Sequence, residues 1–281
     1  MNPAGSNHQN SNKSKAVAII PARFASTRLL GKALIEIAGK PMISWVVEHS
    51  LAARNVDRVI VATDDLRILR VVEAAGYEAV LTSPDHHSGT DRLAEVASSL
   101  KDAEIIVNVQ GDEPLIAAET IDQAVEALMA EDPALGAVGI VTTFEPIESV
   151  ADVLNPDIVK IVVSADGQAL YFSRSSVPYP RDAARKFGGL EAALLNDSTL
   201  LNSFRKHTGL YVYRRDVLLQ FVKWPQSELE IRESLEQLRA LEHGVTIKAI
   251  QASSPSIGVD NLNDLEHVRA ILENSGSTAL D

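Results

Sequence analysis

The sequence lacks several features that would assign it to a common functional class. It contains no cysteine, which excludes disulfides, thiolate metal sites and a cysteine nucleophile. No stretch approaches the roughly 20 apolar residues of a membrane-spanning helix. With 38 acidic against 26 basic residues, the formal net charge of −12 argues against a general binder of nucleic acid or anionic membranes. We expect a soluble, cytoplasmic protein with neither nucleic acid nor a membrane as its partner.

Two familiar phosphate-binding loops are also missing. A Walker A loop built on Gly31 and Lys32 would need glycine at position 26 and serine or threonine at position 33, where the chain has Ser26 and Ala33. The dinucleotide fingerprint needs three closely spaced glycines, and this loop has only Gly31. The sequence therefore argues against a P-loop nucleotidase and against an NAD-dependent oxidoreductase.

Apolar runs of strand length alternate with amphipathic stretches of helix length. With 46% apolar residues, the chain is able to bury a substantial core. The alternation predicts an α/β fold of three layers, in which helices cover both faces of a mostly parallel, twisted sheet. The predicted strands are 16–20, 58–62, 78–81, 105–109, 137–142, 159–163, 207–213 and 245–250. The predicted helices are 41–53, 65–75, 91–100, 120–130, 215–222, 227–242 and 262–273.

The chain is predicted to form a short tail and one domain. Residues 1–15 lack apolar periodicity and predict a flexible tail, and residues 16–281 predict a single domain. Residues 177–202 contain Pro178, Pro180 and two adjacent glycines. They therefore predict a long excursion within the domain rather than a linker between domains.

A cationic loop follows the first predicted strand directly. This loop, PARFASTRLLGK, carries Arg23, Arg28 and Lys32. Open α/β sheets bind ligands at the carboxyl ends of their strands, and these charges suit the phosphates of a nucleotide. A loop of this composition is also often merely solvated. A divalent metal would compensate further phosphate charge and would use some of the surplus carboxylates.

An acidic cluster follows the strand predicted at 105–109. The chain there reads QGDEP, with Asp112 at its centre. If this strand is parallel to the first, Asp112 lies at the same edge of the sheet as the cationic loop. An aspartate beside a polyphosphate suits Mg²⁺, which shares its oxygen ligands with substrate phosphates and water. The alternative is that Asp112 only caps a turn.

The segment 82–92 combines a helix start with polar side chains. Ser88 or Thr90 is expected to cap the helix that follows, which leaves backbone N–H groups free. Arg92 and residues 82–86 add hydrogen-bonding groups that suit a nucleotide base or ribose. Helix capping alone is the simpler interpretation of this segment.

Polar side chains share one face of the strand predicted at 207–213. His207, Gly209 and Tyr211 alternate along it, and the glycine leaves room for a small ligand between two polar-tipped rings. Arg174 follows another strand-like run at 169–172.

The helix predicted at 227–242 carries an apolar stripe with two polar residues beside it. Glu236 and Gln237 lie beside the stripe, and an ordinary solvated face is their simpler interpretation. The stripe is expected to consist of Ile231, Leu235, Leu238 and Leu241.

Nine motifs in order resemble those of the 3-deoxy-manno-octulosonate cytidylyltransferases, also called CMP-KDO synthetases, over nearly all of residues 16–272. They are IIPARFASTRLLGK, VATDD, TSPDHHSGTDRLAEV, IIVNVQGDEPLI, NPDIVK, ALYFSRSSVPY, KHTGLYVYRR, LEQLRALEHG and SIGVDNLNDLEHVR. The resemblance implies a Rossmann-like, GT-A-like nucleotide-diphospho-sugar-transferase fold and a homodimer. It also implies transfer of CMP from CTP to the anomeric hydroxyl of 3-deoxy-D-manno-octulosonate (KDO), giving CMP-KDO and pyrophosphate for lipopolysaccharide assembly.

The resemblance also assigns roles to residues that match the family's motifs. Arg23 and Lys32 would hold the triphosphate, and Asp112 and Asp260 would bind Mg²⁺; these four are the expected catalytic residues. The cytidine and ribose side would be lined by Ser83, Gly89, Arg92 and Gln110. The sugar acid would be contacted by Arg174, His207, Tyr211, Glu236 and Gln237.

The chain departs from the family pattern at two positions of the first loop. Leu30 and Ala33 stand where the family usually has prolines, so we expect a more mobile loop that still supports activity. The substrate alternatives are an 8-amino-KDO or a neuraminate-like sugar acid. From another class, a protein that binds CTP without turnover is the alternative.

Overall fold

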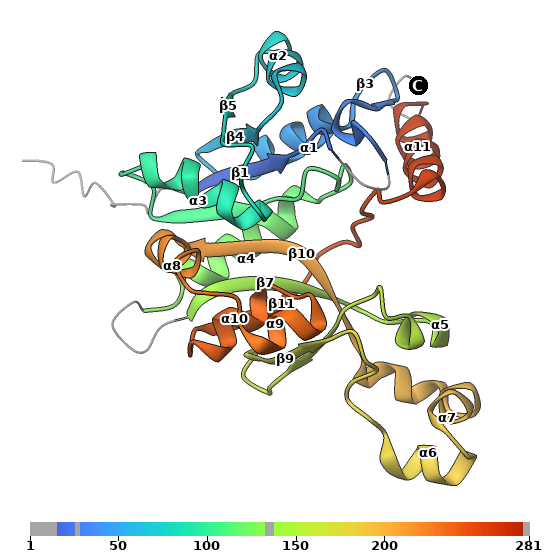
Figure 1. The fold of residues 1–281 in the computed structure, drawn as a ribbon. Coiled ribbons are helices and arrows are strands. Elements are labelled where there is room, and N and C mark those ends of the chain that lie inside the picture. Colours follow the sequence, from blue (N-terminus) through green and yellow to red (C-terminus); the bar gives the residue numbers. More distant parts are fainter. Residues whose placement is uncertain (1–15, 26–28, 133–137, 278–281) are drawn as a thin grey trace, which may run out of the picture.

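A nine-stranded mixed sheet forms the centre of the structure (Figure 1). The computed structural model describes residues 16–25, 29–132 and 138–277, so the tail predicted at 1–15 and Arg28 of the cationic loop lie outside the described residues. The strands of the sheet are β1 (Ala16–Ala22), β4 (Arg58–Thr63), β5 (Ala79–Leu81), β6 (Ile105–Asn108), β7 (Val138–Pro146), β8 (Lys160–Val163), β9 (Ala169–Ser173), β10 (Arg205–Arg214) and β11 (Thr246–Gln251).

The strand order brings the first half of the chain to one side of the sheet and the second half to the other. Along the main path the order is β11-β7-β10-β6-β1-β4-β5, and β8 and β9 extend from β10. β6, β1, β4 and β5 are parallel neighbours, as are β7 and β11, whereas β10 runs antiparallel to both β6 and β7. The α/β class and the mostly parallel sheet predicted from the sequence are confirmed.

Helices follow most strands and cover both faces of the sheet. A small hairpin of β2 (Glu36–Ile37) and β3 (Lys40–Pro41) precedes the first of them. The α-helices are α1 (Met42–Leu51), α2 (Leu66–Ala74), α3 (Gly89–Ser99), α4 (Ala118–Met129), α5 (Val150–Leu154), α6 (Arg181–Phe187), α7 (Leu190–Asn196), α8 (Arg215–Phe221), α9 (Glu228–Glu233), α10 (Gln237–Glu242) and α11 (Leu262–Ser277). Two 3₁₀ helices are η1 (Lys32–Leu34) and η2 (Ser198–Ser203).

Strand alternation divides the main core into two layers. On β1, Ala18 and Ile20 pack with α1, α2 and α4, whereas Val17 and Ile19 pack with α3, α8 and α10 on the opposite face. Successive side chains of a strand point to opposite faces, so a strand buried on both sides is apolar throughout. Arg92, on α3, is fully buried as well. None of the described helices is long and apolar enough to cross a membrane.

The predicted helix at 227–242 is wrong as a single element. The structure has two short helices, α9 and α10, separated at Ser234, whose φ of 53° lies in the left-handed region. The break changes the face that each residue presents, so Ile231 of the expected core stripe is 62% exposed while Leu235 and Leu238 are buried. Glu236 consequently lies at the junction rather than on a continuous helix face.

The predicted excursion at 177–202 contains helices. α6 and α7 form an arm that projects from the body in Figure 1, and residues of α7 and η2 share a small core with Val153 and Phe204. At the other side of the molecule, α11 packs on Ile37 and Met42 in a further apolar cluster. An extended segment without regular structure joins β11 to α11 (Figure 1).

Candidate active site

The loop after β1 folds back so that Lys32 begins η1. Gly31 makes this return possible: its φ is 67°, and its N–H donates to the carbonyl oxygen of Phe24 at 2.8 Å. A Cβ atom added at Gly31 would lie 2.8 Å from the Phe24 ring, so a larger residue would displace that ring. The single glycine of the cationic loop therefore fixes where the lysine side chain starts.

Lys32 meets two aspartates from distant parts of the chain. Its Nζ forms a close ion pair with Asp112 Oδ2, lies 3.5 Å from Asp260 Oδ1 and donates to the Val259 carbonyl oxygen at 3.4 Å. The three side chains are 19%, 27% and 46% exposed in the order Lys32, Asp112, Asp260, so a ligand can reach them. We call these three residues the charged centre. The structure brings together the cationic and acidic groups that the sequence placed at one sheet edge.

Parallel pairing of β1 and β6 explains how the charged centre assembles. Ile19 is paired with Asn108, so the chain leaves both strands at the same edge. Gly111 lies immediately beside β1, because a Cβ atom added there would be 2.8 Å from the Pro21 carbonyl oxygen. Only glycine allows the Asp112 loop to approach the β1 backbone this closely.

Asp260 is delivered by the extended segment 253–260, which we call the strap. Ser253 is anchored to Thr120 of α4, with 2.7 Å between the two hydroxyl oxygens. Ser256 N–H donates to Glu145 Oε1 at 3.0 Å, and Ser256 Oγ donates to Glu113 Oε2 at 3.1 Å. Val259 N–H then donates to the Asp112 carbonyl oxygen at 2.9 Å. The strap is thus bonded to the sheet just before Asp260.

Glu113 is a buried acid that the sequence did not single out. Burial, reinforced by the neighbouring Asp112 charge, raises its pKa from 4.5 to about 7. Its hydrogen bond to Ser256 ties the strap to the loop that follows β6. The sequence signal for this role was weak, since Glu113 adjoins Asp112 in an acidic cluster and Ser256 lies in a loop rich in serine and proline.

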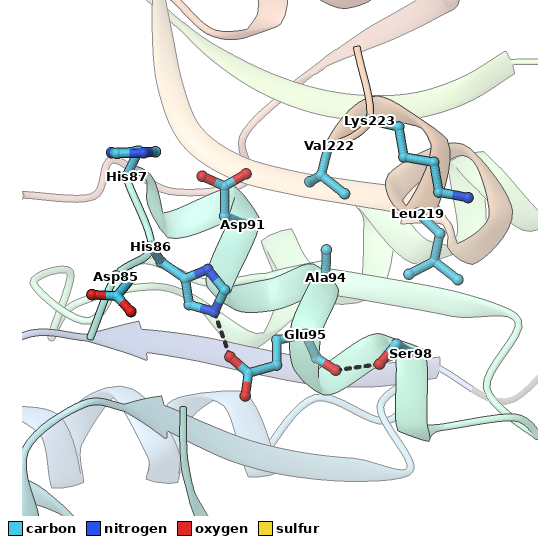
Figure 2. A pocket seen from close by; sticks show the side chains of 10 residues that line it. All are labelled: Asp85, His86, His87, Asp91, Ala94, Glu95, Ser98, Leu219, Val222 and Lys223. Carbon is cyan, nitrogen blue, oxygen red and sulfur yellow. Dashed lines mark hydrogen bonds and ion pairs between the residues drawn. The ribbon is translucent and has the colours of Figure 1, made fainter. Parts of the chain in front are cut away.

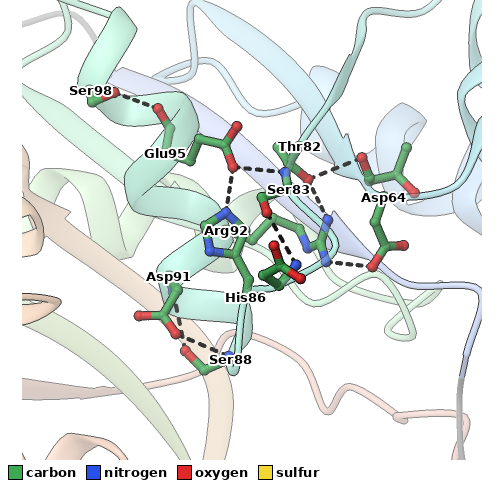
Figure 3. Close-up of polar contacts among 11 residues, drawn as sticks. Asp64, Thr82, Ser83, His86, Ser88, Asp91, Arg92, Glu95 and Ser98 are labelled. Atoms are coloured by element: carbon green, nitrogen blue, oxygen red, sulfur yellow. Dashed lines mark hydrogen bonds and ion pairs between the residues drawn. The ribbon is translucent and has the colours of Figure 1, made fainter.

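Arg92, which was expected to line the cytidine and ribose side, forms hydrogen bonds within the protein (Figure 3). The buried guanidinium donates from Nη2 to Asp64 Oδ2 at 2.7 Å and from Nη1 to Thr82 Oγ1. These bonds join α3 to the ends of β4 and β5, and Arg92 lies too deep to be a surface group. Two buried guanidinium nitrogens, Arg92 Nε and Arg23 Nη2, have no hydrogen-bond partner among the described residues.

Ser88 provides the cap of α3. Its hydroxyl accepts from Asp91 N–H at 3.1 Å, and the Asp91 carboxylate accepts from Ser88 N–H at 3.1 Å (Figure 3). This reciprocal pair is a capping box. Thr90, the other candidate cap, instead donates to Glu236 Oε2 at 2.6 Å. The helix start is therefore linked to the segment between α9 and α10.

A pocket of about 250 Å³ lies where α3, β10 and the α9–α10 junction meet. It gathers five of the predicted site residues, which come from separate segments of the chain. These five are Gly89, Gln110, Tyr211, Glu236 and Gln237. Its other lining residues are Thr90, Asn108, Ile140, Tyr213, Phe221, Ser234 and Leu235. We call this the neutral pocket, because its lining contains one carboxylate and no cationic side chain.

Two tyrosines and a glutamine shape the neutral pocket. The Tyr211 and Tyr213 rings stack with centroids 5.8 Å apart, and burial raises the pKa of both phenols, with the Glu236 charge contributing. Gln110 Nε2 donates to the Gly209 carbonyl oxygen at 3.1 Å. Both phenols therefore remain protonated and able to donate hydrogen bonds.

His207 and Arg174 do not line the neutral pocket. The His207 ring lies next to Tyr211, with 5.3 Å between centroids, and burial lowers its pKa to about 3. Arg174 donates from Nε to the Glu233 carbonyl oxygen at 2.7 Å and from Nη1 to the Pro156 carbonyl oxygen at 3.1 Å. Arg174 therefore binds the backbone carbonyl oxygens of Glu233 and Pro156 instead of lining the neutral pocket. Ser83 lies beyond the pocket lining too, and its N–H donates to Glu95 at 3.0 Å.

A larger cavity, of about 560 Å³, lies between α3 and α8 (Figure 2). Two of its carboxylates make local hydrogen bonds: Asp91 belongs to the capping box of α3, and Glu95 accepts from His86 and from the Ser83 N–H. None of the predicted site residues lines it. The predicted site residues come together at the charged centre and the neutral pocket, and not at the larger cavity. The candidate active site therefore consists of the charged centre and the neutral pocket.

The chain matches known cytidylyltransferases over most of its length. A cytidylyltransferase family model covers residues 17–247. A 3-deoxy-manno-octulosonate cytidylyltransferase from Geobacter sulfurreducens is 53% identical over 251 residues, which are 89% of this chain and 96% of that protein. The enzyme of the same name from Pseudomonas fluorescens is 50% identical over 91% of this chain and 97% of its own length.

A solved structure agrees with these sequence matches. The structure of CMP:2-keto-3-deoxy-manno-octonic acid synthetase complexed with CTP is 41% identical and superposes with a TM-score of 0.82. The match covers 93% of this chain and all of that one. The chain therefore belongs to the 3-deoxy-manno-octulosonate cytidylyltransferase family.

Proposed function

We propose that the protein transfers CMP from CTP to the anomeric hydroxyl of KDO and releases pyrophosphate. The observation that carries this proposal is the charged centre, where Lys32 is bracketed by the carboxylates of Asp112 and Asp260 at the carboxyl edge of β1 and β6. Nucleotides bind at this edge in open α/β sheets. The adjacent neutral pocket offers hydrogen-bonding groups for a polyhydroxylated acceptor.

Arg23 and Lys32 are proposed to bind the triphosphate. As the sugar oxygen bonds to the α-phosphorus, the bond to the pyrophosphate oxygen breaks, and negative charge moves onto phosphoryl oxygens and the leaving group. Cations already fixed in the site stabilise that charge without reorganising. Arg23 Nη2 supports this role, because a buried guanidinium nitrogen with no hydrogen-bond partner among the described residues is suited to a ligand oxygen. No covalent enzyme intermediate is required.

Asp112 and Asp260 are proposed to hold Mg²⁺. The donor set fits, since both carboxylates lie within reach of one ammonium group and remain partly exposed. Among the described residues, no group of three or more His, Asp or Glu side chains could hold a metal by itself. Phosphate and water oxygens would complete the shell, as is usual for Mg²⁺. When bound, the ion would neutralise phosphoryl charge and lower the pKa of the attacking hydroxyl.

The remaining predicted residues are proposed to recognise the two substrates. Tyr211, Glu236 and Gln237 would hydrogen-bond the sugar hydroxyls from the neutral pocket, with His207 beside them. Arg174 would act by fixing the backbone of the α9–α10 junction and by its positive charge. The cytidine and ribose side would be formed by Ser83, Gly89, Arg92 and Gln110.

Three further expectations from the sequence are kept as proposals. Residues 16–281 would act as one catalytic domain, which is supported by the contact between Lys32 in the first loop and Asp260 in the last. The protein would work as a homodimer. It would act in the cytoplasm, where CTP is available.

Turnover with CTP and KDO, with and without Mg²⁺, tests the proposal. We expect Mg²⁺-dependent release of pyrophosphate and a product with the mass of CMP-KDO. A panel containing 8-amino-KDO and a neuraminate distinguishes the related substrate classes, because only the cognate acid should give a low KM. Binding of CTP without product across the whole panel would contradict catalysis and favour a nucleotide-sensing protein.

A further inference from the structure

Thr142 makes two hydrogen-bonding contacts in an irregular part of the sheet. The register of β10 against β7 shifts between His207 and Tyr211, and Thr142 on β7 lies opposite this shift. Its side chain is fully buried. Thr142 Oγ1 donates to the Leu210 carbonyl oxygen at 2.8 Å and lies 2.9 Å from His207 Nε2.

The number of hydrogens available fixes the direction of the second contact. A threonine hydroxyl has one hydrogen, and a carbonyl oxygen can only accept. The hydroxyl hydrogen is therefore committed to Leu210, and the contact with His207 uses a lone pair of Oγ1. His207 Nε2 must then carry a hydrogen, because two lone pairs facing each other at 2.9 Å would repel.

The surroundings of His207 keep the imidazole neutral. Phe172 packs edge-on against the ring with centroids 5.0 Å apart, and Tyr211 packs at 5.3 Å. Burial lowers the ring's pKa to about 3, and no charged group contributes to that shift. With Nε2 protonated and the ring neutral, Nδ1 carries only a lone pair.

His207 Nδ1 remains available to a ligand. Nδ1 forms no hydrogen bond with another described residue. It is also absent from the fully buried atoms that lack a partner in the described residues, so the atom is accessible. The ring adjoins Tyr211, which lines the neutral pocket. A neutral ring with an open lone pair accepts a hydrogen bond and cannot neutralise a carboxylate.

We propose that Thr142 is a positioning residue that holds His207 as an Nε2-protonated neutral imidazole, so that Nδ1 accepts a hydrogen bond from a hydroxyl group of the sugar acid. This inference rests on the proposed function for the identity of the ligand. It gives His207, which the resemblance implied only as a contact of the sugar acid, the specific role of accepting a hydrogen bond from a hydroxyl group. Thr142, which the sequence did not single out, becomes a determinant of substrate recognition.

Nitrogen-15 NMR of the free protein tests the tautomer without any substrate. The chain has 7 histidines, and loss of one set of signals in His207→Gln assigns the ring. We expect the wild-type ring to show Nε2 at the position of a protonated nitrogen and Nδ1 at that of an unprotonated one. A hydrogen on Nδ1, or on both nitrogens, at neutral pH would overturn the proposal.

Kinetics of two Thr142 variants test the functional half. Thr142→Val keeps the shape but removes the hydroxyl, so we expect the KM for the sugar acid to rise about tenfold with little change in the KM for CTP. Thr142→Ser retains the hydroxyl and should restore both the KM and the NMR signature. A folded Thr142→Val protein with an unchanged KM for the sugar acid would overturn the positioning role. Absence of turnover in the wild type would instead refute the proposed function, while the NMR result would still decide the tautomer.

Discussion

The charged centre and the neutral pocket adjoin the same sheet edge but are built by opposite means. Lys32, Asp112 and Asp260 are partly exposed, and one ammonium compensates two carboxylates. The neutral pocket instead relies on half-buried, uncharged donors and acceptors such as Tyr211 and Gln110, and Thr90 donates a hydrogen bond to Glu236. The first arrangement suits a highly charged ligand, and the second suits directional recognition of hydroxyl groups. Substitutions should therefore affect rate in one region and selectivity or stability in the other.

The largest expected effect comes from Asp112 in the charged centre. We expect Asp112→Asn to lower kcat by about 10²-fold or more, because the amide keeps the shape but loses the charge that would hold Mg²⁺. Pyrophosphate release at limiting and saturating Mg²⁺ measures this effect. Glu119→Gln, at an exposed position of α4, is the matched control. A near-normal rate for Asp112→Asn at limiting Mg²⁺ would contradict the metal role.

Removal of the Lys32 ammonium group should have the next largest effect. Lys32→Ala removes the ammonium group that Asp112 and Asp260 share, and with it the proposed phosphate ligand. We expect kcat/KM for CTP to fall by roughly 10- to 100-fold. Lys40→Ala is the control; it lies on the β2–β3 hairpin and breaks a 2.6 Å ion pair with Glu48 of α1. Equal activity of the two variants would show that charge at Lys32 is not needed.

Gly209 packs against Glu113 and Gln110, between the charged centre and the neutral pocket, so a larger residue there would disturb both. A Cβ atom at Gly209 would lie 2.8 Å from Glu113 Oε1 and 2.9 Å from Gln110 Cγ. We expect Gly209→Ala to reduce the free energy of unfolding by about 1–3 kcal/mol and to raise the KM of a substrate. Gly258→Ala is the stability control, since an added Cβ there meets no atom within 4 Å. Identical thermal unfolding of the two variants would disprove the clash.

His207, beside the neutral pocket, should make the free energy of unfolding depend on pH. The pKa of His207 is about 3 in the folded protein against 6.5 ordinarily. Below pH 6.5 the unfolded chain therefore binds a proton that the folded protein refuses, so this contribution to stability is present above 6.5 and is lost as the pH falls toward 3. The loss is at most about 1.4 kcal/mol per pH unit. Because the ring keeps some exposure, we expect less.

Denaturant unfolding of wild type and His207→Gln at about pH 7 and about pH 5 measures this difference. The wild type should lose more stability than the variant between the two conditions. Equal losses would mean that His207 titrates normally, and its ring would then be less shielded from water than its packing against Phe172 and Tyr211 indicates.

The smallest effect is expected outside both regions. Deletion of residues 1–15 should leave kcat and both KM values unchanged, because no predicted site residue lies there. Steady-state kinetics of the deletion variant checks this. A large loss of activity would contradict the prediction of a tail without a catalytic role.

Two of the three residues of the charged centre, Lys32 and Asp112, were predictable from the sequence pattern, whereas the geometry of the neutral pocket was not. Lys32 and Asp112 each follow a strongly apolar strand, and parallel pairing of such strands places their ends together. The strap lacks periodicity, so nothing but family resemblance indicated Asp260. The pocket depends on the Ser234 break and the β10 irregularity, which arise from backbone conformation and not from an apolar pattern. The hydrogen-bond partners of Arg174 could not be predicted either, because they are backbone carbonyl oxygens, which every residue has.

The anchoring of Asp260 has a thermodynamic consequence. Val259 and Leu265 pack with Ile37 and Met42, so Asp260 adjoins a small apolar cluster that joins the β2–β3 hairpin and α1 to α11. A ligand that needs Asp260 binds only while α11 is docked in this cluster, and linkage requires the ligand to stabilise the docking by the same free energy. Mutations on the buried face of α11 would then weaken nucleotide affinity without touching the nucleotide site. The apparent affinity would fall with the fraction of molecules in which α11 is docked.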